Sequence, residues 1–328
     1  MTQPLLTVVM YHYVRPLECS RFPAIKGLDL PLFREQVQWL CRHYRPVALA
    51  EVVAAAAAEV ELPQRPVLLT FDDGYADHYQ YVLPILSEYR ISGAFYPPTA
   101  AVFDRRVLDV NKIHFLLASV APAQILEEME RRVEASPGLP PAEVYRGRHM
   151  SASRLDTPEV AYLKRMLQFG LPESVRTPII SDLFARFVSH DEAAFAEELY
   201  VTVEQLKLMR SLGMEIGSHG DRHSRLDSLT REEQAEDIDR SFRLFDALGL
   251  PRTGFSFCYP YGAYNTETLD LLRQRGCAGA VTTRVELARL DTGSLLEVPR
   301  LDTNCLPTDR LAAVPAWTRC ADTGDLRP

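Results

Sequence analysis

The feature that most constrains this chain is the stretch 66–75, PVLLTFDDGY, in which an apolar run ends in two carboxylates and a glycine. Residues 67–71 have the pattern of a short strand buried on both faces, as in the parallel sheet of an α/β protein. Asp72 and Asp73 then follow at the C-terminal edge of that strand, where barrels and open α/β sheets bind ligands. An exposed Asp-Gly turn is the alternative for the same residues.

Composition limits the kinds of protein that this chain can be. Its 328 residues, 47% of them hydrophobic, are enough for one large α/β domain or two smaller ones. A net charge of −8 argues against a nucleic-acid-binding protein, which needs a basic face. The six cysteines form no close pairs, so neither a zinc ribbon nor a disulfide framework is indicated, and we expect reduced, buried thiols.

The N-terminal residues and the length of the apolar runs indicate where in the cell the protein is expected. Residues 1–14 lack a basic leader and a small-residue cleavage site, which favours a strand over a signal peptide. Apolar runs also stay well short of the roughly 18 residues of a membrane span. The sequence therefore predicts a cytoplasmic protein without a membrane span, and it says nothing about the oligomeric state.

Strand and helix patterns alternate along most of the chain. Capping boxes predict two of the helices, at Thr202 with Gln205 and at Thr230 with Glu233. The expected strands are 5–10, 67–71, 94–96, 216–218, 255–258, 278–282 and 296–301. Because strand–helix crossovers build parallel strands, these patterns predict an α/β fold, a closed or nearly closed β/α barrel of about seven parallel strands.

The segment 104–200 interrupts this alternation. It holds several helix patterns and no convincing strand, and alternation resumes at Thr202. We therefore expect a single domain over residues 1–328, with 104–200 as a helical insertion packed over the rim of the barrel. Long insertions in barrel loops usually carry specificity.

Polar and aromatic residues follow several of the expected strands directly. Parallel strand ends meet at one rim of a barrel, so these residues are expected close together: His12, Asp72 with Asp73, His219, and Tyr261 with Gly262. Two of the eight histidines, His219 and His223, lie four residues apart, and with an acid from another loop they offer the two nitrogens and one oxygen of a catalytic zinc site. Five others have no such spacing, and surface or core roles are expected for them: His43, His78, His114, His149 and His190.

These motifs resemble those of a known family, the polysaccharide deacetylases, also called NodB-homology or carbohydrate esterase family 4 enzymes. The resemblance rests on 70–74 (TFDDG), 219–223 (HGDRH), 259–262 (YPYG) and 10–13 (MYHY), and it covers roughly 4–100 and 200–304. It implies a deformed (β/α) barrel that removes an N-acetyl group from a sugar with a divalent metal, usually zinc.

The resemblance also implies individual roles. Asp72 corresponds to the catalytic base, and Asp73, His219 and His223 correspond to the metal ligands. The backbone N–H of Tyr261 corresponds to a donor to the oxyanion. This assignment is chemically consistent, because a bound metal lowers the pKa of water and a nearby carboxylate can take the proton.

Three positions depart from the family's pattern. Gly220 stands where the histidine motif usually has Ser or Thr, so one hydroxyl contact is missing. Cys258 stands where an arginine usually orients the base; Arg300, at the end of the last expected strand, is a candidate substitute, with a surface or structural role as the alternative. The usual C-terminal histidine is absent, since none lies beyond His223.

His12 is the candidate for that missing histidine. A subset of the family that resembles biofilm exopolysaccharide deacetylases carries it at the N-terminus, in a segment like MYHYV. Protonating the leaving amine suits histidine near neutral pH, and His12 directly follows an expected strand. A core histidine hydrogen-bonded at a strand end is the alternative.

The sequence as a whole predicts a metal-dependent N-deacetylase, with Zn²⁺ or another divalent transition metal as cofactor and an N-acetylated sugar as substrate. It does not distinguish a polysaccharide from an oligosaccharide or a nucleotide- or lipid-linked precursor. Alternatives are a deacylase of another amide, N-formyl or non-sugar, and a barrel that binds a glycan without turnover. The presence of both Asp72 and Asp73 argues against the binding-only alternative, which needs no free base.

Overall fold

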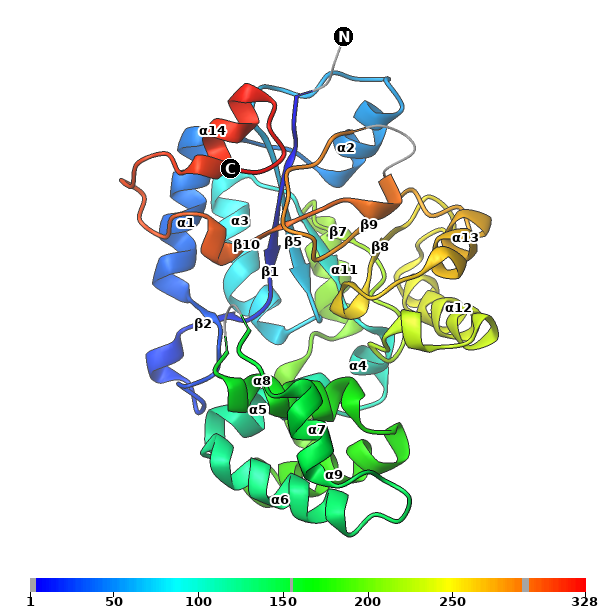
Figure 1. The fold of residues 1–328 in the computed structure, drawn as a ribbon. Coiled ribbons are helices and arrows are strands. Elements are labelled where there is room, and N and C mark those ends of the chain that lie inside the picture. The colour runs from blue at the N-terminus through cyan, green and yellow to red at the C-terminus, as the bar shows by residue number, and fades with distance from the viewer. Residues whose placement is uncertain (1–3, 154–155, 291–294) are drawn as a thin grey trace. The chain divides into compact units, whose positions relative to one another are not determined.

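The computed structural model describes residues 4–153, 156–290 and 295–328. They fall into two compact units, which we call the barrel unit and the helical unit. The barrel unit holds the described residues of Met1–Pro16, Gly27–Asp104 and Glu197–Pro328; the helical unit holds those of Leu17–Lys26 and Arg105–Ala196. Figure 1 labels the elements of both.

Seven parallel strands of the barrel unit form a ring from two sheets that single bridges connect, while β2 and β3 pair separately. Around the central sheet the order is β10-β1-β5-β6-β7, and β8 pairs with β9, all parallel. Two single bridges join these sheets, from Ser218 to Phe257 of β8 and from Val281 of β9 to Val298. The strands are β1 Thr7–Tyr11, β5 Pro66–Asp72, β6 Gly93–Tyr96, β7 Glu215–Ile216, β8 Ser256–Cys258, β9 Gly279–Val281 and β10 Leu301–Asp302. The described chain thus contains the expected seven-stranded barrel.

Alternation along the strands separates two apolar layers, because successive side chains of a strand point to opposite faces. Inside the ring, one buried cluster takes side chains from β1, β5, β6, β8 and β9 and from the segment before β10: Val8, Leu68, Ala94, Tyr96, Cys258, Val281 and Val298. Outside it, Val9, Leu69, Phe71 and Phe95 join a second cluster with Phe33, Leu86 and Leu206 of the surrounding helices. β5 is buried on both faces, as its apolar run predicts.

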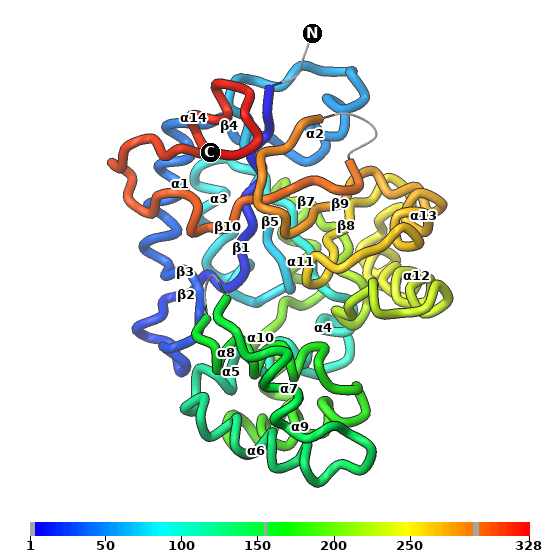
Figure 2. The backbone as a smooth tube through the Cα atoms, in the orientation of Figure 1, coloured from blue at the N-terminus to red at the C-terminus, as the bar shows by residue number. Residues whose placement is uncertain are grey.

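Helices between the strands cover the outside of the ring, as the ribbon and the tube both show (Figure 1, Figure 2). They are α1 Leu30–His43, α2 Leu49–Ala56, α3 Leu83–Tyr89, α4 Thr99–Phe103, α11 Val203–Ser211, α12 Arg231–Leu248, α13 Thr266–Gln274 and α14 Ala316–Thr323. Both expected capping boxes are present, and α12 ends at the left-handed Gly249. A π-helical turn, His78–Val82, precedes α3, and short strands lie at β2 Val14–Arg15, β3 Leu28–Asp29 and β4 Arg45–Pro46.

Two expectations were wrong in detail. A strand was expected over 296–301, but the structure has a 3-10 turn at Leu295–Glu297 and a strand only at Leu301–Asp302. Pro299 lacks the N–H that a regular ladder needs, which limits this segment to single contacts. The cysteines are all free, as expected, but Cys19 is exposed and Cys41, Cys277 and Cys305 are only partly buried.

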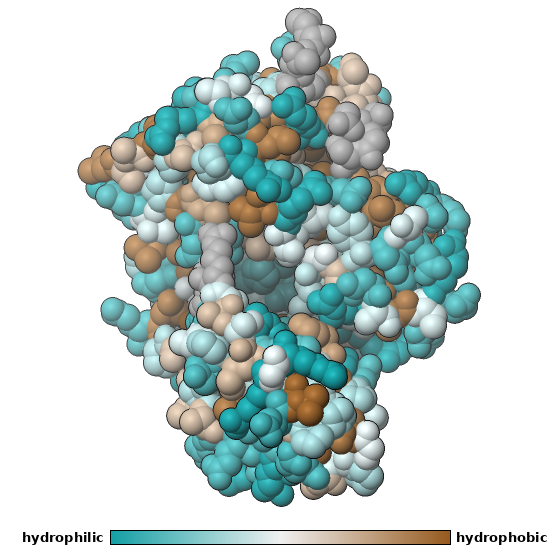
Figure 3. All heavy atoms as spheres, viewed as in Figure 1, coloured by the Kyte–Doolittle hydropathy of each residue, from teal (hydrophilic) through white to brown (hydrophobic). Residues whose placement is uncertain are grey.

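The helical unit has a core of its own. Ile113, Met129, Tyr162 and Ile180 are fully buried in one apolar cluster, and on the face shown in Figure 3 the surface of these helices is mainly hydrophilic. Its helices are α5 Asp109–Ser119, α6 Pro122–Glu134, α7 Ala142–His149, α8 Pro158–Arg165 with a π-helical turn at Met166–Gly170, and α9 Glu173–Phe187; α10 Glu192–Leu199 leads back to the barrel unit. Among the residues described, no helix is long and apolar enough to cross a membrane.

Candidate active site

The end of β5 sends its two carboxylates in different directions. Alternation along the strand directs Thr70 and Asp72 to the same side as the interior residue Leu68. Asp73 then adopts a left-handed backbone, with φ of 71°, and Gly74 follows with φ of 66°. A Cβ on Gly74 would lie 2.5 Å from the Cβ of Pro97, so glycine is required at this turn.

Asp72 forms a buried ion pair with Arg300. Both guanidinium Nη atoms donate to the carboxylate, Nη1 to Oδ1 and Nη2 to Oδ2, each at 2.8 Å. The guanidinium is itself fixed, since Nε donates to the Thr282 carbonyl at 2.8 Å and Nη1 to Thr70 Oγ1 at 3.0 Å. Burial raises the pKa of Asp72, but the charge and hydrogen bonds of Arg300 outweigh it and lower the pKa to about 2. Asp72 is therefore ionised at neutral pH.

Asp73 faces the two histidines. Its Oδ1 lies 3.4 Å from Nε2 of His219 and 3.3 Å from Nε2 of His223. Its Oδ2 accepts a hydrogen bond from the Tyr75 hydroxyl. Oδ1 is buried and receives no hydrogen bond from any described residue. The pKa of Asp73 lies well below its usual range, because the two histidines outweigh the effect of burial.

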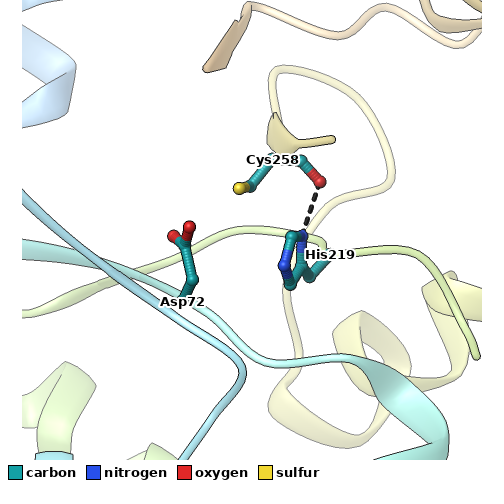
Figure 4. Close-up of side chains that lie close together, drawn as sticks. All are labelled: Asp72, His219 and Cys258. Atoms are coloured by element: carbon teal, nitrogen blue, oxygen red, sulfur yellow. Dashed lines mark hydrogen bonds between the residues drawn. The ribbon is translucent and has the colours of Figure 1, made fainter. Parts of the chain in front are cut away.

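The orientation of His219 leaves its Nε2 as an acceptor. Its Nδ1–H donates to the Cys258 carbonyl at 2.7 Å (Figure 4), so in the neutral ring Nε2 carries a lone pair. That lone pair faces Asp73 Oδ1. Burial lowers the pKa of His223, which favours its neutral ring. Burial also lowers the pKa of His219, but the contacts with Cys258 and Asp73 outweigh it and raise that pKa well above its usual value, so a bound metal would replace a proton on this ring. With both rings deprotonated at Nε2, three acceptor atoms converge on one point, which is the arrangement that a cation stabilises.

The buried atoms therefore fit a divalent metal held by Asp73, His219 and His223, whose donor atoms all lie within 4.8 Å of one another. A second set, Asp72, His219 and Cys258, is equally compact (Figure 4). It fits a cation less well, because the Arg300 guanidinium already occupies both Asp72 oxygens and its Nη2 lies 3.3 Å from Cys258 Sγ. A metal there would be repelled by this positive charge.

His12 lies beside Asp72, as its position after β1 predicts. Its Nε2 is 3.8 Å from Asp72 Oδ2, and its side chain is 41% exposed, whereas the carboxylate is buried. The His12 carbonyl accepts a hydrogen bond from Nε2–H of the buried His78 at 2.9 Å. His78 thus has the expected core role, but the contact with His12 was not foreseen, because nothing in a helix pattern indicates it.

Tyr261 lies in the turn Pro260–Gly262 after β8, and its ring contacts His223 edge-on with the centroids 4.7 Å apart. Its backbone is left-handed, with φ of 60°. Of the seven non-glycine residues with positive φ in the described chain, Asp73, His223 and Tyr261 belong to this site. Strained backbone of this kind gathers where function requires a fixed geometry.

Comparisons with known proteins agree with this geometry. A family model described as polysaccharide deacetylase matches residues 59–135 and 186–280, just over half of the chain. The Bacillus subtilis protein YxkH, named as a polysaccharide deacetylase, is 36% identical over 94 residues, which are 29% of this chain and 33% of that protein. The Escherichia coli K12 poly-β-1,6-N-acetyl-D-glucosamine N-deacetylase is 40% identical over 79 residues, 24% of this chain and 11% of that protein. The matched parts thus cover a third or less of these relatives.

Solved structures share the fold over nearly the whole length. The deacetylase PplD of Streptococcus pyogenes, solved in complex with acetate, aligns over 100% of both chains with a TM-score of 0.56 and 17% identity. IcaB from Ammonifex degensii aligns over 98% of this chain and 97% of its own, with a TM-score of 0.53 and 20% identity. At 17% and 20% sequence identity, these similarities establish a shared fold and nothing more.

Proposed function

The chain belongs to the polysaccharide deacetylase family, and on that premise we propose that it hydrolyses the N-acetyl group of an amino sugar with a divalent metal held by Asp73, His219 and His223. The observation that carries the proposal is Asp73 Oδ1, a buried carboxylate oxygen without a hydrogen-bond partner among the described residues, facing the Nε2 atoms of both histidines. Two nitrogens and one carboxylate are the ligand set of many catalytic zinc sites, so Zn²⁺ is the metal we favour.

When bound, the metal polarises the amide oxygen and makes water more acidic. Asp72 takes the proton from the attacking water as general base. It is ionised, buried and held on both oxygens by Arg300, so its position beside the ligand set is fixed before substrate binds. Arg300 acts through Asp72 as a positioning residue, in place of the arginine that the family usually carries where Cys258 stands.

The remaining steps concern the tetrahedral intermediate. The backbone N–H of Tyr261 donates to the developing oxyanion. His12 protonates the leaving amine, a role supported by its Nε2 lying 3.8 Å from Asp72 Oδ2 and by its partly exposed side chain. These two roles, and a place in the subset with an N-terminal histidine, stay predictions.

The substrate class is an N-acetylated sugar. One relative is named for action on poly-β-1,6-N-acetyl-D-glucosamine, so β-1,6-linked N-acetylglucosamine oligomers are the first compounds to try. N-formyl and non-sugar amides are the alternative substrates. A barrel that only binds glycans is disfavoured, because a buried carboxylate kept ionised beside the ligand set has no use without turnover.

Acetate release tests the proposal. Purified protein is incubated with N-acetylglucosamine oligomers, N-acetylated sugar nucleotides, and N-formyl and non-sugar amides, with and without a chelator. We expect acetate from at least one sugar, loss of activity with chelator, and recovery with Zn²⁺. Formate or acid release from the other amides alone would favour the alternative deacylase. Sugar binding without any release would overturn the proposed reaction.

A further inference from the structure

The loop that carries both histidines runs from β7 to α12, and the residue directly after its first histidine has no hydroxyl. Gly220 stands at that position. Its φ is +71°, and a Cβ built on it would lie 2.5 Å from Oδ1 of Asp237, so both the backbone and the space require glycine. A carboxylate from α12 therefore lies where a side chain of the loop would otherwise extend.

Asp237 contacts the backbone of this loop. It is 7% exposed; its Oδ1 accepts from the Asp221 N–H at 2.9 Å, and its Oδ2 lies 3.4 Å from the Arg222 nitrogen, a weaker bond. These two residues immediately precede His223, which has a left-handed φ of 58°. The carboxylate thus holds the turn that sets the direction of His223.

Other contacts hold the same loop from a different side. The N–H groups of Thr99 and Ala100, at the start of α4, donate to the carbonyls of Gly220 at 3.1 Å and Asp221 at 2.9 Å. Those bonds fix the carbonyl side of the loop. On the N–H side, Ser218 Oγ accepts from Gly220 at 3.1 Å, and Asp237 accepts from Asp221 and Arg222, the two residues before His223.

We propose that Asp237 is a positioning residue of the metal centre, which substitutes through the loop backbone for the hydroxyl that Gly220 lacks. The inference rests on the proposed metal site. Removing a group that orients a metal ligand typically weakens metal affinity 10–100-fold. A role in general stability would instead lower the melting temperature and leave the affinity of the folded protein unchanged.

The test compares Asp237→Ala with the matched control Asp239→Ala. Asp239 lies two residues further along α12, has a side chain 56% exposed, and pairs with Arg275 away from the loop. The dissociation constant for Zn²⁺ is measured by competition with a chromophoric chelator, and thermal melting of the metal-free proteins reports on the fold. We expect affinity about 10–100-fold weaker in Asp237→Ala, with kcat at saturating Zn²⁺ within a few-fold of wild type, and no change in affinity for Asp239→Ala.

Asp237→Asn keeps the proposal testable if Asp237→Ala does not fold. Its amide oxygen can still accept from Asp221, while the amide nitrogen cannot accept from Arg222, so a smaller, several-fold loss of affinity is expected. Unchanged affinity in the variant that folds would overturn the positioning role. A wild type that binds Zn²⁺ but releases no acetate would refute the proposed reaction alone, since affinity is measured without turnover.

Discussion

The two adjacent carboxylates at the end of β5 share their burial, with 2% of each residue exposed, but not their surroundings. On the Asp72 side, both oxygens are paired with one guanidinium, which fixes the carboxylate and keeps it charged. On the Asp73 side, one oxygen is bound by Tyr75 and the other faces two histidine nitrogens without a hydrogen bond. Both oxygens of Asp72 therefore have protein hydrogen-bond donors, whereas Oδ1 of Asp73 has none among the described residues.

This difference separates two chemical tasks that the sequence shows as a simple pair of acids. The Arg300 guanidinium suits a general base, because it holds the Asp72 carboxylate in place and keeps it charged. The carboxylate can then accept a proton from water. A carboxylate oxygen that has no hydrogen bond and faces the Nε2 atoms of two imidazoles suits a metal ligand, because one cation can bind all three atoms. The proposed roles thus follow from the environment of each carboxylate and not from its residue type, as in other sites that hold two carboxylates.

The largest expected effect comes from Asp72→Asn, which removes the proposed base while it keeps the size of the side chain. We expect kcat to fall about 10²–10⁴-fold or more, and the zinc content of the purified protein to stay near that of the wild type. Acetate release and elemental analysis measure the two quantities.

His223→Ala is the matched comparison on the other side of the site. It should lose the metal, and its activity should fall with the metal content. If Asp72→Asn also lost its metal, or if His223→Ala kept full occupancy and activity, the division between the two carboxylates would not hold.

The next effect concerns His12, which lies on the Asp72 side, 3.8 Å from the carboxylate. His12→Ala should retain metal while kcat falls roughly 10²–10⁴-fold, because the leaving amine then takes its proton from water. Substrates with a better leaving group should lose less. Zinc analysis together with kcat for two such substrates checks this, and an unchanged kcat would exclude His12 as the acid.

Much of this arrangement could be predicted from the sequence, because parallel strand ends meet at one rim. His12, Asp72 and His219 each directly follow an expected strand, and the structure brings them together. The capping boxes at Thr202 and Thr230 were equally local signals and are confirmed. In each case a few neighbouring residues carry the information.

The contacts that hold the site were harder to predict, since they join elements far apart in the chain. Asp237 lies in the middle of a polar helix, and its burial follows from how α12 packs on the loop of the histidines. Arg300 was a candidate for orienting the base only through the family resemblance and its place at a strand end, and a structural role was the alternative. Its pairing with Asp72, 228 residues away, depends on the irregular segment before β10. Sequence patterns report periodicity and local capping, and they do not report which distant polar groups meet.

A smaller effect is expected at Arg300, where substitution disturbs the Asp72 side without removing the base. Arg300→Lys keeps the positive charge but cannot bind both carboxylate oxygens. The resulting shift of Asp72 should lower kcat about 10²-fold, with zinc content and KM nearly unchanged. Arg300→Ala should in addition cost about 3–5 kcal/mol of folding free energy, because it leaves a buried charge unpaired. Unchanged kcat in Arg300→Lys would show that the pair is structural only.

The smallest expected effect is the acid dependence of stability. Arg300 outweighs burial and lowers the pKa of Asp72 from 3.8 in the unfolded chain to about 2 in the folded protein. The folded state therefore binds fewer protons than the unfolded state between these values, and the stabilisation is complete above about pH 4 and lost as the pH falls through 2. At about 1.4 kcal/mol per pKa unit, this contribution is about 2 kcal/mol.

Denaturant unfolding between pH 5 and pH 2 measures it, with chelator present so that metal release from Asp73 does not contribute. Wild type should lose about 2 kcal/mol more over this range than Asp72→Asn, which has no carboxylate to titrate at this position. Only the slopes are compared, because the Asn variant starts from a lower stability with Arg300 unpaired. Asp73 also has a lowered pKa but is present in both proteins, so its effect cancels. Parallel curves would mean that the Asp72–Arg300 pair does not stabilise the fold, and the contrast between the two carboxylates would then rest on the metal alone.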